Sequence, residues 1–125
     1  MKNMDPKEIA QDFLNLAAKG RSQEAFRLYM SPDFKHHNVY FKSDADTLIQ
    51  AMEESAKLNP SKTFKIHHIL KDENMVAVHS HVKQNDNDLG TAVVHFFRFE
   101  SEKIVELWDL GQAVPSKMIN ENGMF

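Results

Sequence analysis

The sequence predicts an α+β fold in which helices come first and an antiparallel sheet follows. As far as Pro60, apolar residues recur every three or four positions, which is the spacing of a helix with one buried face. From Lys62 onward the apolar residues alternate with polar ones, which is the spacing of a strand. Consecutive helices followed by consecutive strands are typical of folds in which helices cover one face of a sheet.

Three helices are expected in the first half of the chain. Asp5 can cap the first helix through its carboxylate, and Pro6 suits the first helical position. Serine hydroxyls are expected to cap the other two, at Ser22 and Ser43, because they can accept a bond from a free backbone N–H. The three helices are expected to end near Gly20, Met30 and Asn59, where glycine or a nearby proline interrupts the pattern.

Four strands are expected in the second half, separated by short polar turns such as residues 71–74 and 85–88. The expected strands are residues 63–70, 75–84, 91–100 and 104–113. Because each strand follows the previous one after a short turn, we expect an antiparallel meander. A length of 125 residues favours a single domain that covers residues 1–125.

Composition excludes several classes of protein. The net charge is −3 and no basic run stands out, so we expect neither nucleic acid nor an anionic membrane as a partner. The chain has no cysteine, which excludes disulfides and thiolate metal sites. Charged residues are scattered through the first twenty positions, and no apolar stretch is long enough to span a bilayer. We therefore expect a soluble cytoplasmic protein.

One acidic residue interrupts the buried face of the last strand. Val105, Leu107 and Asp109 share a face by alternation, and His95 is a comparable exception in the preceding strand. A three-residue loop at 101–103 keeps the two faces of this hairpin separate, whereas a two-residue loop mixes them. The longer loop predicts the cross-strand pairs Phe99 with Val105, Arg98 with Glu106, Phe97 with Leu107, Phe96 with Trp108 and His95 with Asp109.

The predicted pairing of His95 with Asp109 suggests a proton-transfer site. A carboxylate in an apolar hollow is a stronger base, because the surroundings solvate its charge poorly. A neighbouring imidazole can orient that carboxylate or donate a hydrogen bond to a developing oxyanion. The alternative is a structural pair of a histidine and an aspartate that satisfy each other.

The other histidines are weaker candidates for a functional site. His36, His37 and Asn38 follow the second helix and could lie at a pocket mouth, or could cap their own loop. His79 and His81 share one face of their strand, but the valines on the opposite face indicate that both histidines point outward. His67 and His68 are adjacent in sequence, so we expect them to point to opposite faces of the sheet. We expect no metal site.

These features together resemble the SnoaL-like family, which belongs to the NTF2-like superfamily. The resemblance rests on the helical N-terminal half, the His37-Asn38 pair after the second helix, the hairpin from His95 to Asp109, and Gln112. It implies a cone-shaped α+β barrel in which a curved antiparallel sheet wraps around the helices and encloses a pocket. It also implies a homodimer through the outer face of the sheet.

The resemblance implies roles for individual residues. In the polyketide cyclases of this family, the aspartate that matches Asp109 abstracts a proton next to a carbonyl group, and the histidine that matches His95 assists at the oxygen. No cofactor takes part. Residues that match His37 and Asn38 line the pocket. Leu107 departs from the pattern, because the cyclases carry histidine there.

We therefore expect an enzyme that performs cofactor-free acid–base chemistry on a small apolar carbonyl compound. Asp109 and His95 are the expected catalytic residues, and the residues expected to contact substrate are His37, Asn38, Phe97, Leu107 and Gln112. One alternative is a non-catalytic module for ligand binding or dimerisation, since one fold hosts many functions. Another is a metal-dependent enzyme that uses His79, His81 and a third ligand.

Overall fold

A computed structural model describes residues 4–125, so the first three residues of the expected domain lie outside the described part. The elements in chain order are α1 (Pro6–Ala18), α2 (Ser22–Tyr29), β1 (Met30–His36), α3 (Ala45–Leu58), β2 (Thr63–Asp72), β3 (Met75–Lys83), β4 (Thr91–Glu100) and β5 (Lys103–Ala113). Three helices precede a meander of four antiparallel strands, which confirms the predicted α+β class.

The three helices form where the sequence pattern predicts them, but two of the expected caps are wrong. Asp5 caps α1 by accepting a bond from the Lys7 N–H at 3.3 Å, as expected. Ser22 is the first residue inside α2, and its fully buried hydroxyl makes no capping bond. The cap of α3 is Asp44 instead of Ser43, and it accepts the Thr47 N–H at 2.8 Å. Asp44 takes the capping position instead of Ser43 because its negative charge also interacts favourably with the positive end of the helix dipole.

The strand β1 was not expected from the sequence. Its residues Met30–His36 follow α2 directly and pair in parallel with β5, at the edge of a sheet with the order β1-β5-β4-β3-β2. A parallel partner about seventy residues away leaves no turn signal nearby. Pro32 and a shift of register between Met30 and Lys35 also hide the strand pattern.

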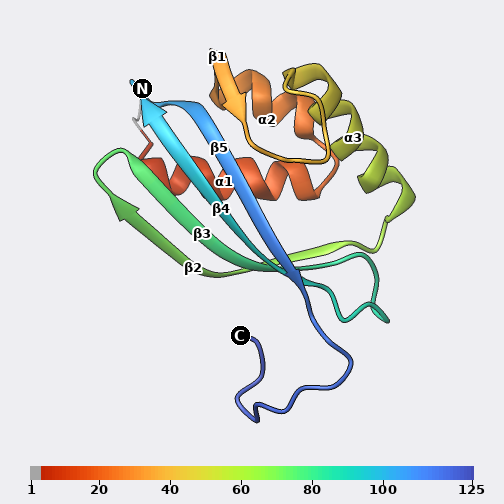
Figure 1. Ribbon diagram of the computed structural model, residues 1–125. Coiled ribbons are helices and arrows are strands. Elements are labelled where there is room, and N and C mark those ends of the chain that lie inside the picture. The colour runs from red at the N-terminus through yellow and green to blue at the C-terminus, as the bar shows by residue number, and fades with distance from the viewer. Residues whose placement is uncertain (1–3) are drawn as a thin grey trace.

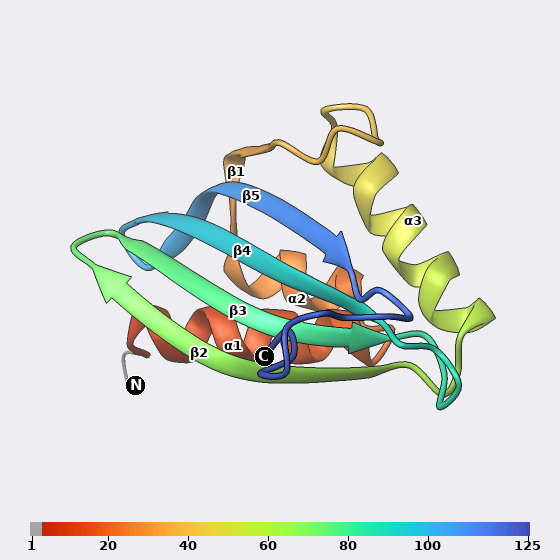
Figure 2. The same ribbon diagram turned by 60° about the horizontal axis from the view of Figure 1, so that its bottom comes forward.

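The sheet is strongly curved and remains open, with β1 and β2 as its two edges (Figure 1). It therefore differs from a closed barrel. Helix α1 lies along the concave face of the sheet, while α3 stands at its side (Figure 2). Phe13 of α1 packs edge-on against Phe97 of β4 with ring centroids 5.8 Å apart, and both side chains are fully buried. This core holds α1 against the sheet and leaves the space beside it for a pocket.

The hairpin of β4 and β5 confirms most of the predicted register. His95 faces Asp109, Phe96 faces Trp108, Phe97 faces Leu107 and Arg98 faces Glu106. The expected pair of Phe99 with Val105 is wrong, because Phe99 faces Ile104. The turn has two residues, Ser101 and Glu102, both with positive φ, and a bulge between Arg98 and Phe99 restores the register further along.

A second bulge changes the outer face of the sheet, the face turned away from α1. The register of β2 and β3 shifts between Ile66 and His68. His67 and His68 therefore both lie beside His79, at ring-centroid distances of 5.9 and 5.3 Å. The expectation that these two neighbours point to opposite faces is wrong, because the extra residue breaks the alternation.

Candidate functional site

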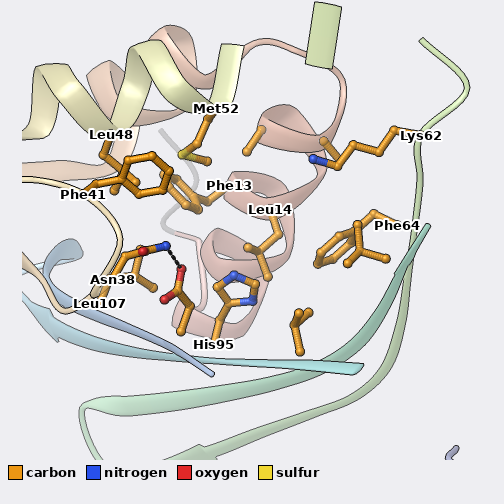
Figure 3. Close-up of a pocket in the computed structure, with 15 residues that line it drawn as sticks. Phe13, Leu14, Asn38, Phe41, Leu48, Met52, Lys62, Phe64, His95 and Leu107 are labelled. Carbon is orange, nitrogen blue, oxygen red and sulfur yellow. Dashed lines mark hydrogen bonds between the residues drawn. The ribbon is translucent and has the colours of Figure 1, made fainter. Parts of the chain in front are cut away.

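A mostly apolar pocket of about 210 Å³ lies between the concave face of the sheet, α1 and α3 (Figure 3). Its polar lining residues are Asn38, Lys62, His95 and Asp109. The other lining residues are apolar side chains of the helices, the strands and the loop after β1: Phe13, Leu14, Ala17, Ala18, Phe41, Leu48, Met52, Phe64, Val82, Val93 and Leu107. An apolar hollow with a few polar groups is the usual form of a small-molecule site.

Asp109 reaches this pocket from β5, and Asn38 fixes its carboxylate. The Asn38 amide nitrogen donates a hydrogen bond to Asp109 Oδ2 at 2.9 Å. The amide oxygen of Asn38 accepts the Tyr40 N–H at 3.0 Å, so both ends of the carboxamide are held. This arrangement orients the carboxylate and leaves its second oxygen without a partner among residues 4–125.

The loop that carries Asn38 is itself held by His36. One ring nitrogen of His36 accepts the Asn38 N–H at 3.2 Å, and the other lies 2.8 Å from the Lys42 carbonyl oxygen. His36 is buried beneath this loop. The sequence His36-His37-Asn38 thus includes one residue that binds the backbone of its own loop and one that reaches into the pocket.

His95 lies deep in the molecule, next to Asp109 across the hairpin. The ring surface that stays accessible faces the pocket, while Nδ1 is shielded and has no hydrogen-bond partner among residues 4–125. Burial lowers the pKa of His95 to about 4, against the smaller opposing effect of the Asp109 charge. The imidazole is therefore neutral at pH 7. The described residues show no hydrogen bond or ion pair between the two side chains, which disfavours a self-satisfied structural pair.

The structure brings some of the expected substrate contacts together and not others. Asn38 and Leu107 line the pocket with Asp109 and His95. Phe97 is fully buried and packs beneath the His95 ring, so it supports the pocket wall without lining it. Gln112 is exposed, and by alternation it lies on the outer face with Trp108.

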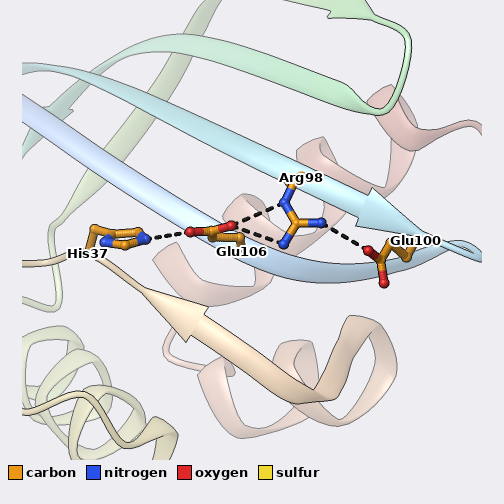
Figure 4. A network of polar contacts seen from close by, with 4 residues as sticks. All are labelled: His37, Arg98, Glu100 and Glu106. Atoms are coloured by element: carbon orange, nitrogen blue, oxygen red, sulfur yellow. Dashed lines mark hydrogen bonds and ion pairs between the residues drawn. The ribbon is translucent and has the colours of Figure 1, made fainter.

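His37 also lies outside the pocket, which corrects its expected place beside Asn38. Its ring stacks on Trp108 with centroids 5.1 Å apart, on the outer face. His37 Nε2 lies 2.6 Å from Glu106, which also accepts two hydrogen bonds from Arg98 (Figure 4). The His37 hydrogen bond, with help from Arg98, lowers the pKa of Glu106. This network ties the loop after β1 to the sheet. Adjacent residues of an extended segment point in opposite directions, so His37 lies on the outer face while Asn38 lines the pocket.

Among the lining residues that were not expected from the sequence, Lys62 and Phe41 lie outside the helices and strands. Both lie in connections next to a strand or a helix and belong to no periodic pattern. Lys62 precedes β2 and Phe41 lies in the loop between β1 and α3. A signal for Phe41 was present, because an aromatic residue in a polar loop suggests a contact. Nothing in the sequence marks Lys62 among the other lysines.

The outer-face histidines are covered by the end of the chain. His79 and His81 point outward as expected, and the Phe125 ring stacks on His67, His79 and His81. Within residues 4–125, no group of three or more potential ligands is arranged to hold a metal ion. The same residues include no helix that is long and apolar enough to cross a membrane.

The curved sheet around α1 defines the NTF2-like fold. An NTF2-like protein of unknown function from Cytophaga hutchinsonii aligns with a TM-score of 0.71, over 89% of this chain and 93% of the other, at 12% identity. Within that fold, the chain belongs to the SnoaL-like family, because the model of the SnoaL-like domain matches residues 10–107. This confirms the resemblance inferred from the hairpin. No curated protein matches the sequence.

Two further solved structures share the fold at low identity. AclR from Streptomyces galilaeus, a proposed hydroxylase, aligns with a TM-score of 0.73 over 89% of this chain and 91% of its own, at 19% identity. IdmH from Streptomyces antibioticus, a proposed polyketide cyclase, aligns with a TM-score of 0.67 over 86% and 92%, at 15% identity. These different descriptions on one fold mean that the chemistry has to be argued from the site.

Proposed function

We propose that this protein is a cofactor-independent enzyme that abstracts a proton next to a carbonyl group, with Asp109 as the general base. The observation that supports this most strongly is the Asp109 carboxylate inside an apolar pocket, held by Asn38 and beside a neutral imidazole. A general base needs a fixed position near the substrate and a poorly solvating environment. Asn38 holds the Asp109 carboxylate in place, and most of the residues that line the pocket around it are apolar.

The reaction begins when an Asp109 oxygen takes the proton from the carbon next to the carbonyl. The electrons of the broken C–H bond form a C=C double bond, and the carbonyl electrons move to the oxygen. A neutral His95 can donate a ring N–H to that oxygen as negative charge develops. Where a C=C bond is conjugated with the enolate, Asp109 returns its proton to the far carbon of that bond, which is an isomerisation. Where the molecule has a second carbonyl, the enolate carbon attacks it and closes a ring, and the resulting alkoxide takes the proton from Asp109.

The dimensions of the pocket favour a small substrate. Its volume of about 210 Å³ lies below the ~300–1,000 Å³ that is typical of small-molecule pockets. A compound with one ring or a short chain fits this space better than a polycyclic precursor does. Leu107 adds an apolar wall at the position where the family's cyclases carry histidine, which also favours a simple carbonyl compound over a polyphenol.

A non-catalytic binding module is the second candidate, and the largely apolar lining supports it. Replacing Asp109 by asparagine separates the two. Ethyl acetoacetate or cyclohexanone is incubated with the protein in D₂O. Deuterium incorporation at the carbon next to the carbonyl is then followed by NMR. An enzyme accelerates the exchange, and Asp109→Asn removes the acceleration while ligand affinity persists. A binding module gives no exchange above buffer with either protein.

We also propose a homodimer through the outer face of the sheet, in a cytoplasmic protein. Leu110 is 63% exposed on this face, beside the half-buried Phe96 and Trp108, and an apolar strip of this kind favours a partner. Sedimentation at micromolar concentration should give a dimer, and Leu110→Lys should give a monomer. A wild-type protein that sediments as a monomer would contradict the dimer.

A further inference from the structure

Lys62 is a cation in an otherwise apolar part of the pocket. It lies at the end of the turn that leads from α3 to β2, where its N–H bonds the Asn59 carbonyl at 3.0 Å. Its side chain lines the pocket, and its nitrogen points inward (Figure 3). Exposed lysines usually keep the ammonium in water, so an inward orientation needs a compensating contact.

The described residues offer Lys62 no such contact. Its ammonium forms no ion pair and no side-chain hydrogen bond within residues 4–125. Two lysines do form side-chain hydrogen bonds. These are Lys83 and Lys103, and both donate to backbone carbonyls at the surface. Burial lowers the pKa of Lys62, with no nearby acid to oppose the effect. A bound anion would remove this penalty, because a charge in apolar surroundings is stabilised mainly by an opposite charge.

The polar groups divide the pocket into two parts. Lys62 lies on one side, and Asn38, which bonds Asp109, lies on the other (Figure 3). Lys62 and Asp109 form no ion pair with each other. A ligand with a carbonyl group at one end and a negative charge at the other matches this division. A phosphate would bring a second negative charge into a pocket that holds one lysine and the acid Asp109, so a carboxylate fits better.

We infer that the pocket binds oxo acids, with the ligand carboxylate at Lys62 and the ligand carbonyl at Asp109 and His95. This assignment deepens the proposed function, and it rests on that function only for the place of the carbonyl. Lys62 would then select substrates that carry an anionic end, while the apolar walls between the two polar parts accept the short carbon chain. A pocket volume of about 210 Å³ suits a short carbon chain.

The test compares 4-oxopentanoate with its methyl ester, which differs in charge and keeps the ketone. Dissociation constants are measured by NMR titration for the wild type, Lys62→Met, Lys62→Arg and Lys65→Met. Lys65 is an exposed lysine on the neighbouring strand and serves as the control. The wild type and Lys65→Met should prefer the acid over the ester by about tenfold, which corresponds to ~1.4 kcal/mol. Lys62→Met should lose that preference, and Lys62→Arg should keep most of it.

A wild type that binds acid and ester equally, or binds neither, would overturn the inference. So would a preference for the acid that survives in Lys62→Met. Deuterium exchange, followed in the same samples, separates this result from the proposed function. Exchange that depends on Asp109 without any acid preference refutes only the role of Lys62, whereas an acid preference without exchange refutes only the catalysis.

Discussion

The neutral state of His95 predicts a specific loss of stability in acid. Burial lowers the pKa of His95 from 6.5 to about 4 in the folded protein. As the pH falls below 6.5, the unfolded chain takes up a proton at this residue before the folded chain does. The contribution of the neutral His95 to the free energy of unfolding is therefore fully present above pH 6.5, and it is lost as the pH falls towards 4.

The size of the effect follows from the two pKa values. At pH 5 the unfolded chain is almost fully protonated at His95, while the folded chain is mostly neutral there. The free energy of unfolding should therefore fall by up to about 2 kcal/mol between pH 7 and pH 5 through this residue alone. Other histidines and acids titrate over the same range, so the effect of His95 has to be isolated by substitution.

The assay is urea unfolding at pH 7 and pH 5 for the wild type and for His95→Gln, which keeps a polar side chain and does not titrate. The contributions of the other groups are common to both proteins and cancel in the comparison. The wild type should lose up to about 2 kcal/mol more than the variant. Equal losses within about 0.5 kcal/mol in the two proteins would mean that His95 is not held neutral by burial.

Two further predictions concern single contacts of the fold and site. Asn38→Ala removes the hydrogen bond to Asp109, and it should slow deuterium exchange about tenfold through a loss of roughly 1.5 kcal/mol. An unchanged exchange rate would show that Asn38 does not orient the base. Gly90 has a φ of +89°, and a Cβ there would lie 2.4 Å from the Val82 carbonyl oxygen. Gly90→Ala should therefore lower the free energy of unfolding by more than about 2 kcal/mol in urea melts, whereas Gly123→Ala, with nothing near its Cβ, should cost less.

The pairing of His95 with Asp109 could be predicted from the sequence because alternation fixes register wherever one face is buried. The expected three-residue loop is wrong, but the register that it predicts is right from Arg98 to His95. The turn itself has two residues, and the bulge before Phe99 adds the residue that the longer loop would have provided. Residues beyond the bulge therefore keep the predicted partners, while Phe99 does not.

The remaining features depend on contacts between distant segments, which no local pattern encodes. β1 forms because β5 offers it a parallel edge, and that pairing places His37 on the outer face and Asn38 in the pocket. Lys62 faces the pocket because of the path of one turn. For the same reason the sequence indicates a base and its neighbour but not the full polar lining of the site.

We propose that Asp109 is the base of a proton-transfer enzyme, and this role can be tested directly. The most direct measurement is the ratio of deuterium exchange rates next to the ketone of 4-oxopentanoate for the wild type and Asp109→Asn, each corrected for buffer. A positioned general base contributes about 10²- to 10⁴-fold, so the ratio should be at least about one hundred. A ratio near one, with both proteins folded and binding the ligand, would mean that Asp109 is not the base.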